Sequence, residues 1–158
     1  MERTFVLPKV GEFSASVSVD SICRYEKVPT NILPTEMEGA KYAASLVVDA
    51  INEHKSDKKF VLGLSTGRSP IGLYKELVNM YNQGKVSFKN VEVYSLDEFY
   101  PMAPDSPQSR NYRIHEEFLN HVDIAPENVH FPDGTVPMDE VNAYCESIEQ
   151  KISGKIDL

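Results

Sequence analysis

The apolar run at residues 60–64, Phe-Val-Leu-Gly-Leu, constrains the fold of this chain more than any other segment. It is short and holds no polar residue, which is typical of a strand buried on both faces of a parallel sheet. A second strand is expected at residues 91–96, and helical patterns precede, separate and follow the two strands. This alternation predicts an α/β fold with a parallel sheet.

Helix boundaries can be predicted from capping residues and from apolar spacing. Thr35 followed by Glu38 forms a capping box at the start of a helix over residues 36–54. Ser69 is expected to cap the next helix, with Pro70 at its first position. Apolar stripes predict further helices over residues 70–81, 109–121 and 141–152, a short strand at 128–131 and another strand that begins at Ile156.

The first 34 residues are expected to form an N-terminal extension to the domain. Residues 13–19 alternate between apolar and polar side chains, which favours an edge strand or an arm. Pro29 and Pro34 then interrupt the chain. The domain itself is therefore expected to begin at residue 35.

Charge and cysteine content exclude several classes of protein. The chain has 16 Lys and Arg against 24 Asp and Glu, a net charge of −8, which disfavours nucleic acid as a partner. No segment approaches the roughly 20 apolar residues of a membrane span, and no signal-peptide pattern is present. Cys23 and Cys145 lack metal-ligand spacing and are interpreted as free thiols in a reducing cytoplasm, with Cys145 in the core.

The loop at residues 65–70 is the first candidate binding site. It joins a strand to a helix N-terminus, where free N–H groups and the helix dipole favour an anion. Ser65, Thr66 and Ser69 supply hydroxyl groups, Gly67 allows close backbone approach, and Arg68 adds charge. A tight turn with an ordinary helix cap explains the same residues equally well.

The Asp97–Glu98 pair is the candidate catalytic site. Asp97 follows a predicted strand, and ligands of such sheets bind beyond the carboxyl ends of the strands. Partial burial of Asp97 beside Glu98 would favour proton uptake and suit Asp97 to act as a general base. The alternative is a loop-start aspartate that accepts backbone hydrogen bonds. Arg110 is a candidate phosphate contact, and Arg113 is expected on a solvated face.

These segments together resemble the glucosamine-6-phosphate deaminase/isomerase family. The likeness lies in the phosphate loop and helix at 62–77, the Asp-Glu-aromatic motif at 95–99, and residues 118–134. Residues 26–30 and 132–135 further resemble a long bacterial variant that carries a second, deacetylase-like domain. The resemblance implies a three-layer, Rossmann-like α/β/α fold of the sugar-phosphate isomerase/deaminase type, represented over 35–158 by its N-terminal part.

The resemblance also implies a reaction. The phosphate of an acyclic amino sugar would lie at residues 66–69, and Asp97, supported by Glu98, would move a proton from carbon 2 to carbon 1. Ammonia and fructose 6-phosphate would form without a cofactor or metal, since the chemistry needs a positioned base and a held anion. Family members often assemble as homo-oligomers.

Three departures from the family pattern affect this interpretation. The family's ring-opening Asp-Gly-His segment and its following Glu find no match, nor do the later Arg and Lys that clamp the phosphate. Arg110 stands where deaminases commonly have an aromatic residue. We therefore expect little turnover from this stretch alone. The alternatives are a 6-phosphogluconolactonase, disfavoured because Phe99 stands where lactonases have Arg, and a non-catalytic sugar-phosphate sensor.

Overall fold

The structure, a computed structural model, describes residues 31–152 and 156–158. The chain divides into two units, Met1–Ile32 and Leu33–Leu158, and the fold described below is that of the second. The predicted arm at residues 13–19, Cys23 and the segment 26–30 lie outside the described residues, as does Gly154.

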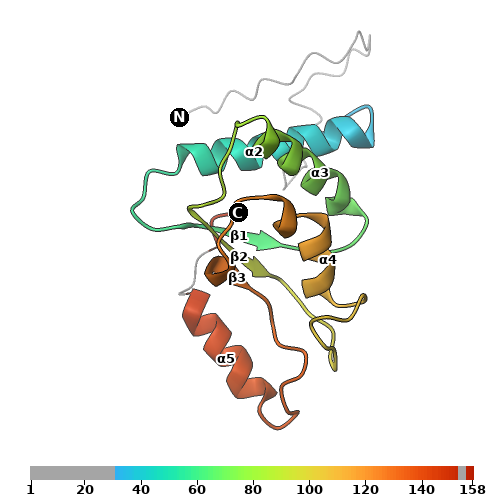
Figure 1. The fold of residues 1–158 in the computed structure, drawn as a ribbon, viewed down its shortest axis with the longest axis vertical. Coiled ribbons are helices and arrows are strands. Elements are labelled where there is room, and N and C mark those ends of the chain that lie inside the picture. Colours follow the sequence, from blue (N-terminus) through green and yellow to red (C-terminus); the bar gives the residue numbers. More distant parts are fainter. Residues whose placement is uncertain (1–30, 153–155) are drawn as a thin grey trace, which may run out of the picture. The chain divides into compact units, whose positions relative to one another are not determined.

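A parallel sheet forms the centre of this unit (Figure 1). Its strands are β1 (Phe60–Leu64), β2 (Val91–Ser95) and β3 (Val129–His130), in that order. Phe60 pairs with Val91 and Leu64 with Ser95, so β1 and β2 are in register along their whole length. Instead of a new strand at Ile156, the chain runs beside the free edge of β1, where the Asp157 amide donates to the Val61 carbonyl at 2.9 Å.

Three helices cover one face of the sheet. They are α2 (Glu36–Glu53), α3 (Ser69–Asn82) and α4 (Arg110–Glu117). Their buried side chains pack against alternate residues of β1 and β2 and against the segment between α3 and β2. The most deeply buried residues of this cluster include Ala44, Val48, Leu62, Tyr74, Leu77, Phe88, Val91, Val93, Ile114 and Phe118. This cluster is the hydrophobic core, which holds the carboxyl ends of the two strands in place.

The other face of the sheet is less completely buried than the sequence predicted. Every second residue of β1, beginning at Val61, is only half-buried, and so is Glu92 of β2. The helix α5 (Val141–Ile152) lies on this side (Figure 1), where Tyr144 and Ile148 line a pocket together with Tyr94. The prediction of strands buried on both faces was wrong for these positions, because α5 covers only part of the face.

The start of α2 agrees with the sequence prediction, whereas Phe118 and Cys145 do not lie where the sequence placed them. Thr35 caps α2 by accepting the Glu38 amide at 3.2 Å, as the capping box predicted. The helix predicted over 109–121 ends at Glu117 and continues as a short 3₁₀ turn, Leu119–His121, because Phe118 leaves helical geometry. Cys145 is exposed rather than in the core, because α5 holds no fully buried residue.

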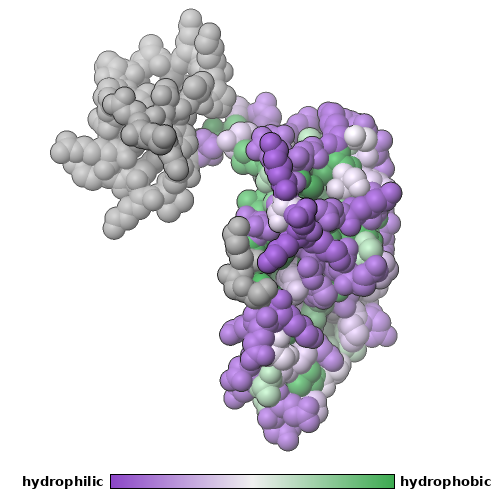
Figure 2. All heavy atoms as spheres, turned by 90° about the vertical axis from the view of Figure 1, so that its left-hand side faces the viewer, coloured by the Kyte–Doolittle hydropathy of each residue, from purple (hydrophilic) through white to green (hydrophobic). Residues whose placement is uncertain are grey.

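The amino-terminal ends of the strands lie on a polar side of the molecule. Figure 2 shows this side, where hydrophilic residues predominate over the described part of the surface. No helix in the described part of the chain is both long enough and apolar enough to cross a bilayer. The candidate site lies at the opposite, carboxyl ends of the strands.

Candidate active site

The two candidate loops leave the sheet at neighbouring positions. Leu64 and Ser95, the last residues of β1 and β2, are register partners, and the Leu96 amide donates to the Leu64 carbonyl at 2.9 Å. The loop at 65–70 and the Asp97–Glu98 pair therefore begin side by side. The sequence predicted this juxtaposition from the shared direction of parallel strands.

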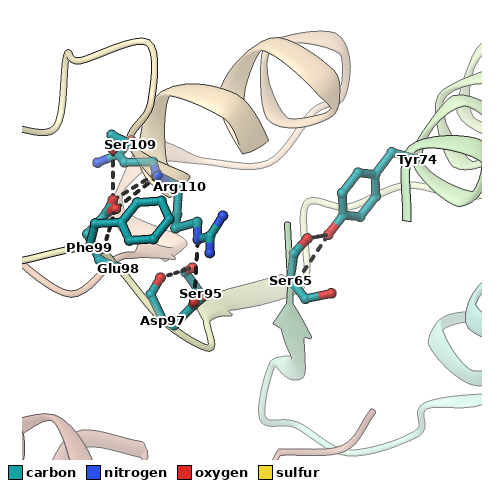
Figure 3. A network of polar contacts seen from close by, with 9 residues as sticks. Ser65, Tyr74, Ser95, Asp97, Glu98, Phe99, Ser109 and Arg110 are labelled. Carbon is teal, nitrogen blue, oxygen red and sulfur yellow. Dashed lines mark hydrogen bonds and ion pairs between the residues drawn. The ribbon is translucent and has the colours of Figure 1, made fainter. Parts of the chain in front are cut away.

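Tyr74 fixes the first residue of the loop at 65–70 (Figure 3). Its phenol donates to the Ser65 carbonyl at 2.5 Å and accepts the Ser65 amide at 3.2 Å. The ring is 2% exposed and stacks on Phe118 with centroids 5.3 Å apart. Burial raises the pKa of Tyr74 to about 12, so the phenol keeps its proton and remains a donor at neutral pH.

In the rest of this loop, Thr66 and Gly67 have features that suit a bound ligand. The Thr66 hydroxyl oxygen is buried and finds no hydrogen-bond partner among the described residues. Gly67 has φ of +124°, a conformation that side chains rarely adopt, and open space surrounds the position of a Cβ. Burial of a hydroxyl without a hydrogen-bond partner is unfavourable, so a ligand with an acceptor oxygen at this position would stabilise the loop.

The start of α3 differs from the sequence prediction. Ser69 is the first helical residue and Arg68 occupies the cap position, where no side chain bonds the first turn. The prediction of Ser69 as the cap was therefore wrong. Without a capping side chain, the N–H groups of the first turn remain available to an anion beside Thr66 and Gly67.

Asp97 is held by its backbone and by one cation. Ser95 donates its hydroxyl to the Asp97 carbonyl at 2.9 Å, and Arg110 Nε lies 3.3 Å from Asp97 Oδ2. The Asp97 side chain is 55% exposed. The expectation of a partly buried Asp97 beside a second carboxylate was wrong, because Glu98 turns toward α4.

Glu98 connects the strand end to the N-terminus of α4. One carboxylate oxygen accepts the amides of Phe99 at 2.8 Å and Arg110 at 3.0 Å. The other accepts the Ser109 hydroxyl at 2.7 Å and the Asn111 amide at 3.1 Å. Burial acts to raise the pKa of Glu98, but these four hydrogen bonds outweigh it, so the pKa lies below its ordinary value. Glu98 therefore connects the end of β2 to the first turn of α4.

Arg110 lies between these two acidic residues. Its backbone amide is bound by Glu98, its guanidinium pairs with Asp97, and its Cζ lies 4.1 Å from the centroid of the Phe99 ring. Arg113, one turn along α4, is 54% exposed with Glu117 at 3.8 Å, so its predicted place on a solvated face is confirmed. The two arginines of this helix therefore have different surroundings.

Sequence reasoning missed the side chains that position the site. The apolar spacing placed Tyr74 in a helical stripe and the resemblance placed it in the helix after the loop, but neither indicated its bonds to Ser65. Ser109, which is fully buried, was expected to begin a helix but not to bind Glu98. Within residues 31–152 and 156–158, no group of three or more metal-ligating side chains gathers at this site or elsewhere.

The sequence model of a protein family described as glucosamine-6-phosphate isomerases/6-phosphogluconolactonase matches residues 34–158. This chain belongs to that family. It is 45% identical over 123 residues to a glucosamine-6-phosphate deaminase of Halothermothrix orenii, a match that covers 77% of the chain and 49% of the relative. The corresponding enzyme of Drosophila melanogaster is 40% identical over 131 residues, which cover 80% of the chain and 47% of the relative.

Solved structures of glucosamine-6-phosphate isomerase/6-phosphogluconolactonase family members share the fold. A monomeric glucosamine-6-phosphate deaminase superposes with a TM-score of 0.70 at 30% identity, over 77% of this chain and 48% of that one. A 6-phosphogluconolactonase of Thermotoga maritima gives 0.58 at 24% identity, over 72% of this chain and 49% of that one, which shows a common fold alone. The chain thus spans about half the length of each of these proteins.

Proposed function

We propose that this protein is a glucosamine-6-phosphate deaminase, which converts the amino sugar phosphate and water to fructose 6-phosphate and ammonia. One observation carries the proposal. A loop whose buried Thr66 hydroxyl has no hydrogen-bond partner among the described residues, and which leads into an uncapped helix start, lies beside the exposed carboxylate of Asp97. The names of the relatives at 40–45% identity support the same reaction.

In this proposal the loop holds the phosphate of the substrate. Thr66 donates its hydroxyl, Ser65 and Ser69 add theirs, and the backbone at Gly67 allows an oxygen to approach closely. Arg68, which is exposed, adds positive charge. Tyr74 holds the loop to the end of β1, so the bound phosphate has a fixed distance to Asp97.

Asp97 is the proposed base. Its carboxylate takes the proton from carbon 2 of the open-chain substrate; the electron pair of that C–H bond forms a double bond between carbons 1 and 2, and the carbonyl pair moves onto the oxygen of carbon 1. That oxygen takes a proton from the substrate ammonium, and Asp97 returns its own proton at carbon 1, which leaves a protonated imine at carbon 2. Water hydrolyses the imine to the ketone and releases ammonia, so the chemistry requires no further co-reactant.

The test is ammonia release from glucosamine 6-phosphate by the full-length protein and by its Asp97→Asn variant. The proposal predicts ammonia from the wild type and a loss of at least about 100-fold in the variant, which keeps the shape of Asp97 without its basicity. Lactone hydrolysis without ammonia would favour a 6-phosphogluconolactonase. Binding without either reaction would favour a sugar-phosphate sensor.

Further proposals concern the assembly, the location and the domain boundaries. We infer a homo-oligomer and a cytoplasmic location, the latter supported by the free, exposed thiol of Cys145. Residues 1–34 as an extension and 35–158 as the N-terminal part of the domain remain predictions, as does a deacetylase-like domain in a longer protein. Light scattering of the purified protein tests the oligomer directly.

A further inference from the structure

The guanidinium of Arg110 is fixed beside the proposed base. Its Nε binds Asp97 Oδ2 at 3.3 Å and its Cζ rests 4.1 Å from the Phe99 ring centroid. The side chain is only 23% exposed. Glu98 also accepts a hydrogen bond from the Arg110 backbone amide, so both the backbone of Arg110 and its guanidinium are held in place. A group held at both ends is suited to act at a defined position.

The terminal nitrogens of this guanidinium have no hydrogen-bond partner within the described part of the chain. Arginine has five N–H donors, of which Nε accounts for one. Across residues 31–152 and 156–158, the contact of the Arg110 side chain with a polar group is the one from Nε to Asp97. In Figure 3 the guanidinium lies next to Asp97, and its two terminal nitrogens are on the side toward Ser65. They therefore face the space between the base and the phosphate loop.

The charge that moves during the reaction suits this arrangement. When Asp97 takes the proton from carbon 2, its carboxylate becomes neutral and the negative charge passes to the oxygen on carbon 1. The reacting carbon must lie about 3–3.5 Å from the carboxylate, and from there the oxygen on the neighbouring carbon can reach the guanidinium that binds the same carboxylate. The guanidinium of Arg110 can then release Asp97 and bind the new oxyanion. One negative charge lies beside the guanidinium before and after this exchange.

A role in binding the substrate phosphate suits these contacts less well. A phosphate at the terminal nitrogens would also stand beside the carboxylate of Asp97, which repels it. The loop at 65–70 offers an anion site without an acidic neighbour in its hydrogen bonds, since Ser65 is bound by a neutral phenol. The oxyanion avoids this conflict because it forms only as Asp97 is neutralised.

We propose that Arg110 is a catalytic residue that stabilises the oxyanion formed at carbon 1 when Asp97 removes the proton from carbon 2. This deepens the proposed function and rests on it. The C–H electron pair moves into the bond between carbons 1 and 2, and the carbonyl pair moves onto the oxygen. Arg110 donates hydrogen bonds to that oxygen and forms no covalent bond. Such donors act mainly in the transition state.

The experiment compares two open-chain ligands by calorimetry. One is the hydroxamic acid of arabinonic acid 5-phosphate, whose head resembles the oxyanion intermediate once it has given its proton to Asp97, and the other is glucitol 6-phosphate, which has a neutral alcohol there. The variants are Arg110→Gln and Arg110→Lys. Arg113→Gln on the same helix is the matched control, because its side chain is exposed and lies outside the site.

We expect Arg110→Gln to weaken the hydroxamate by roughly 10- to 100-fold, the value of one or two charged hydrogen bonds. Glucitol 6-phosphate should bind within about twofold of the wild type, and Arg110→Lys should recover part of the hydroxamate affinity because it keeps the charge. The control should leave both dissociation constants unchanged. Circular dichroism confirms that each variant is folded.

Two results would overturn the assignment of Arg110. Equal weakening of both ligands would make Arg110 a phosphate contact, and unchanged affinity for both would remove it from the site. In either case the wild type still binds and the proposed function stands. A wild type that binds neither ligand would instead refute the proposed sugar-phosphate site, and the role of Arg110 with it.

Discussion

Replacing Glu98 with Gln tests whether this carboxylate holds the two halves of the site together. The substitution keeps the size and shape of the side chain but removes its charge. One oxygen remains, which can still accept the amides of Phe99 and Arg110. The new NH₂ group faces the Ser109 hydroxyl and the Asn111 amide. The hydroxyl can rotate to accept a hydrogen bond from this group, but the Asn111 N–H is itself a donor and cannot accept one.

The expected loss of stability follows from these contacts. A hydrogen bond to a charged group contributes about 1.5–3 kcal/mol and a neutral one about 0.5–1.5 kcal/mol. The two retained bonds therefore weaken, and the Asn111 amide loses its acceptor. Because Glu98 is only half-buried, water replaces part of what is lost. We expect the free energy of unfolding at pH 7 to fall by about 2 kcal/mol, or roughly 6 °C in melting temperature.

Urea unfolding at several pH values measures this loss and its cause. The pKa of Glu98 is lowered in the folded protein, so its contribution is complete above the ordinary value of 4.5. It is lost as the pH falls through the lowered folded value. The difference between wild type and variant should therefore shrink below pH 4.5. Glu116→Gln, an exposed position on the same helix, is the control. A difference under about 0.5 kcal/mol at pH 7 would refute the reasoning.

Two further substitutions test the packing around the site. Tyr74→Phe keeps the ring stack but leaves the Ser65 carbonyl and amide unpaired, at a cost of about 2 kcal/mol in urea unfolding. The raised pKa of Tyr74 also predicts wild-type stability that falls as the pH rises from 10 toward 12, a fall the variant should lack. Gly134→Ala places a Cβ 2.5 Å from the Phe99 carbonyl and should lower the melting temperature by several degrees, whereas Gly39→Ala meets no atom within 4 Å and should not.

The strands and the main helices were predictable because their signals are local. The run at residues 60–64 is apolar throughout and ends in a polar loop, and Thr35 with Glu38 marks the start of α2. Local signals failed where tertiary packing decides the structure. Phe118 continues a helical apolar stripe, yet it leaves the helix and is buried between Tyr74 and Phe88.

The candidate site was predictable in its position but not in its contacts. The sequence places Asp97 and the loop at 65–70 after neighbouring parallel strands, which brings them to one edge of the sheet. It does not show that Arg110, 13 residues further on, returns across a proline-rich loop to bind Asp97. Pairings of this kind depend on the path of an irregular segment, for which hydrophobic periodicity carries no information.

The central proposal is that the loop at 65–70 and Asp97 form a single sugar-phosphate site. The most direct test is a titration of the ¹⁵N-labelled protein with glucosamine 6-phosphate, followed by NMR. We predict saturable shifts of the backbone amides of Thr66, Gly67 and Asp97 together, with no such shifts from unphosphorylated glucosamine. Unmoved amides in the loop, or equal shifts with both sugars, would contradict the claim.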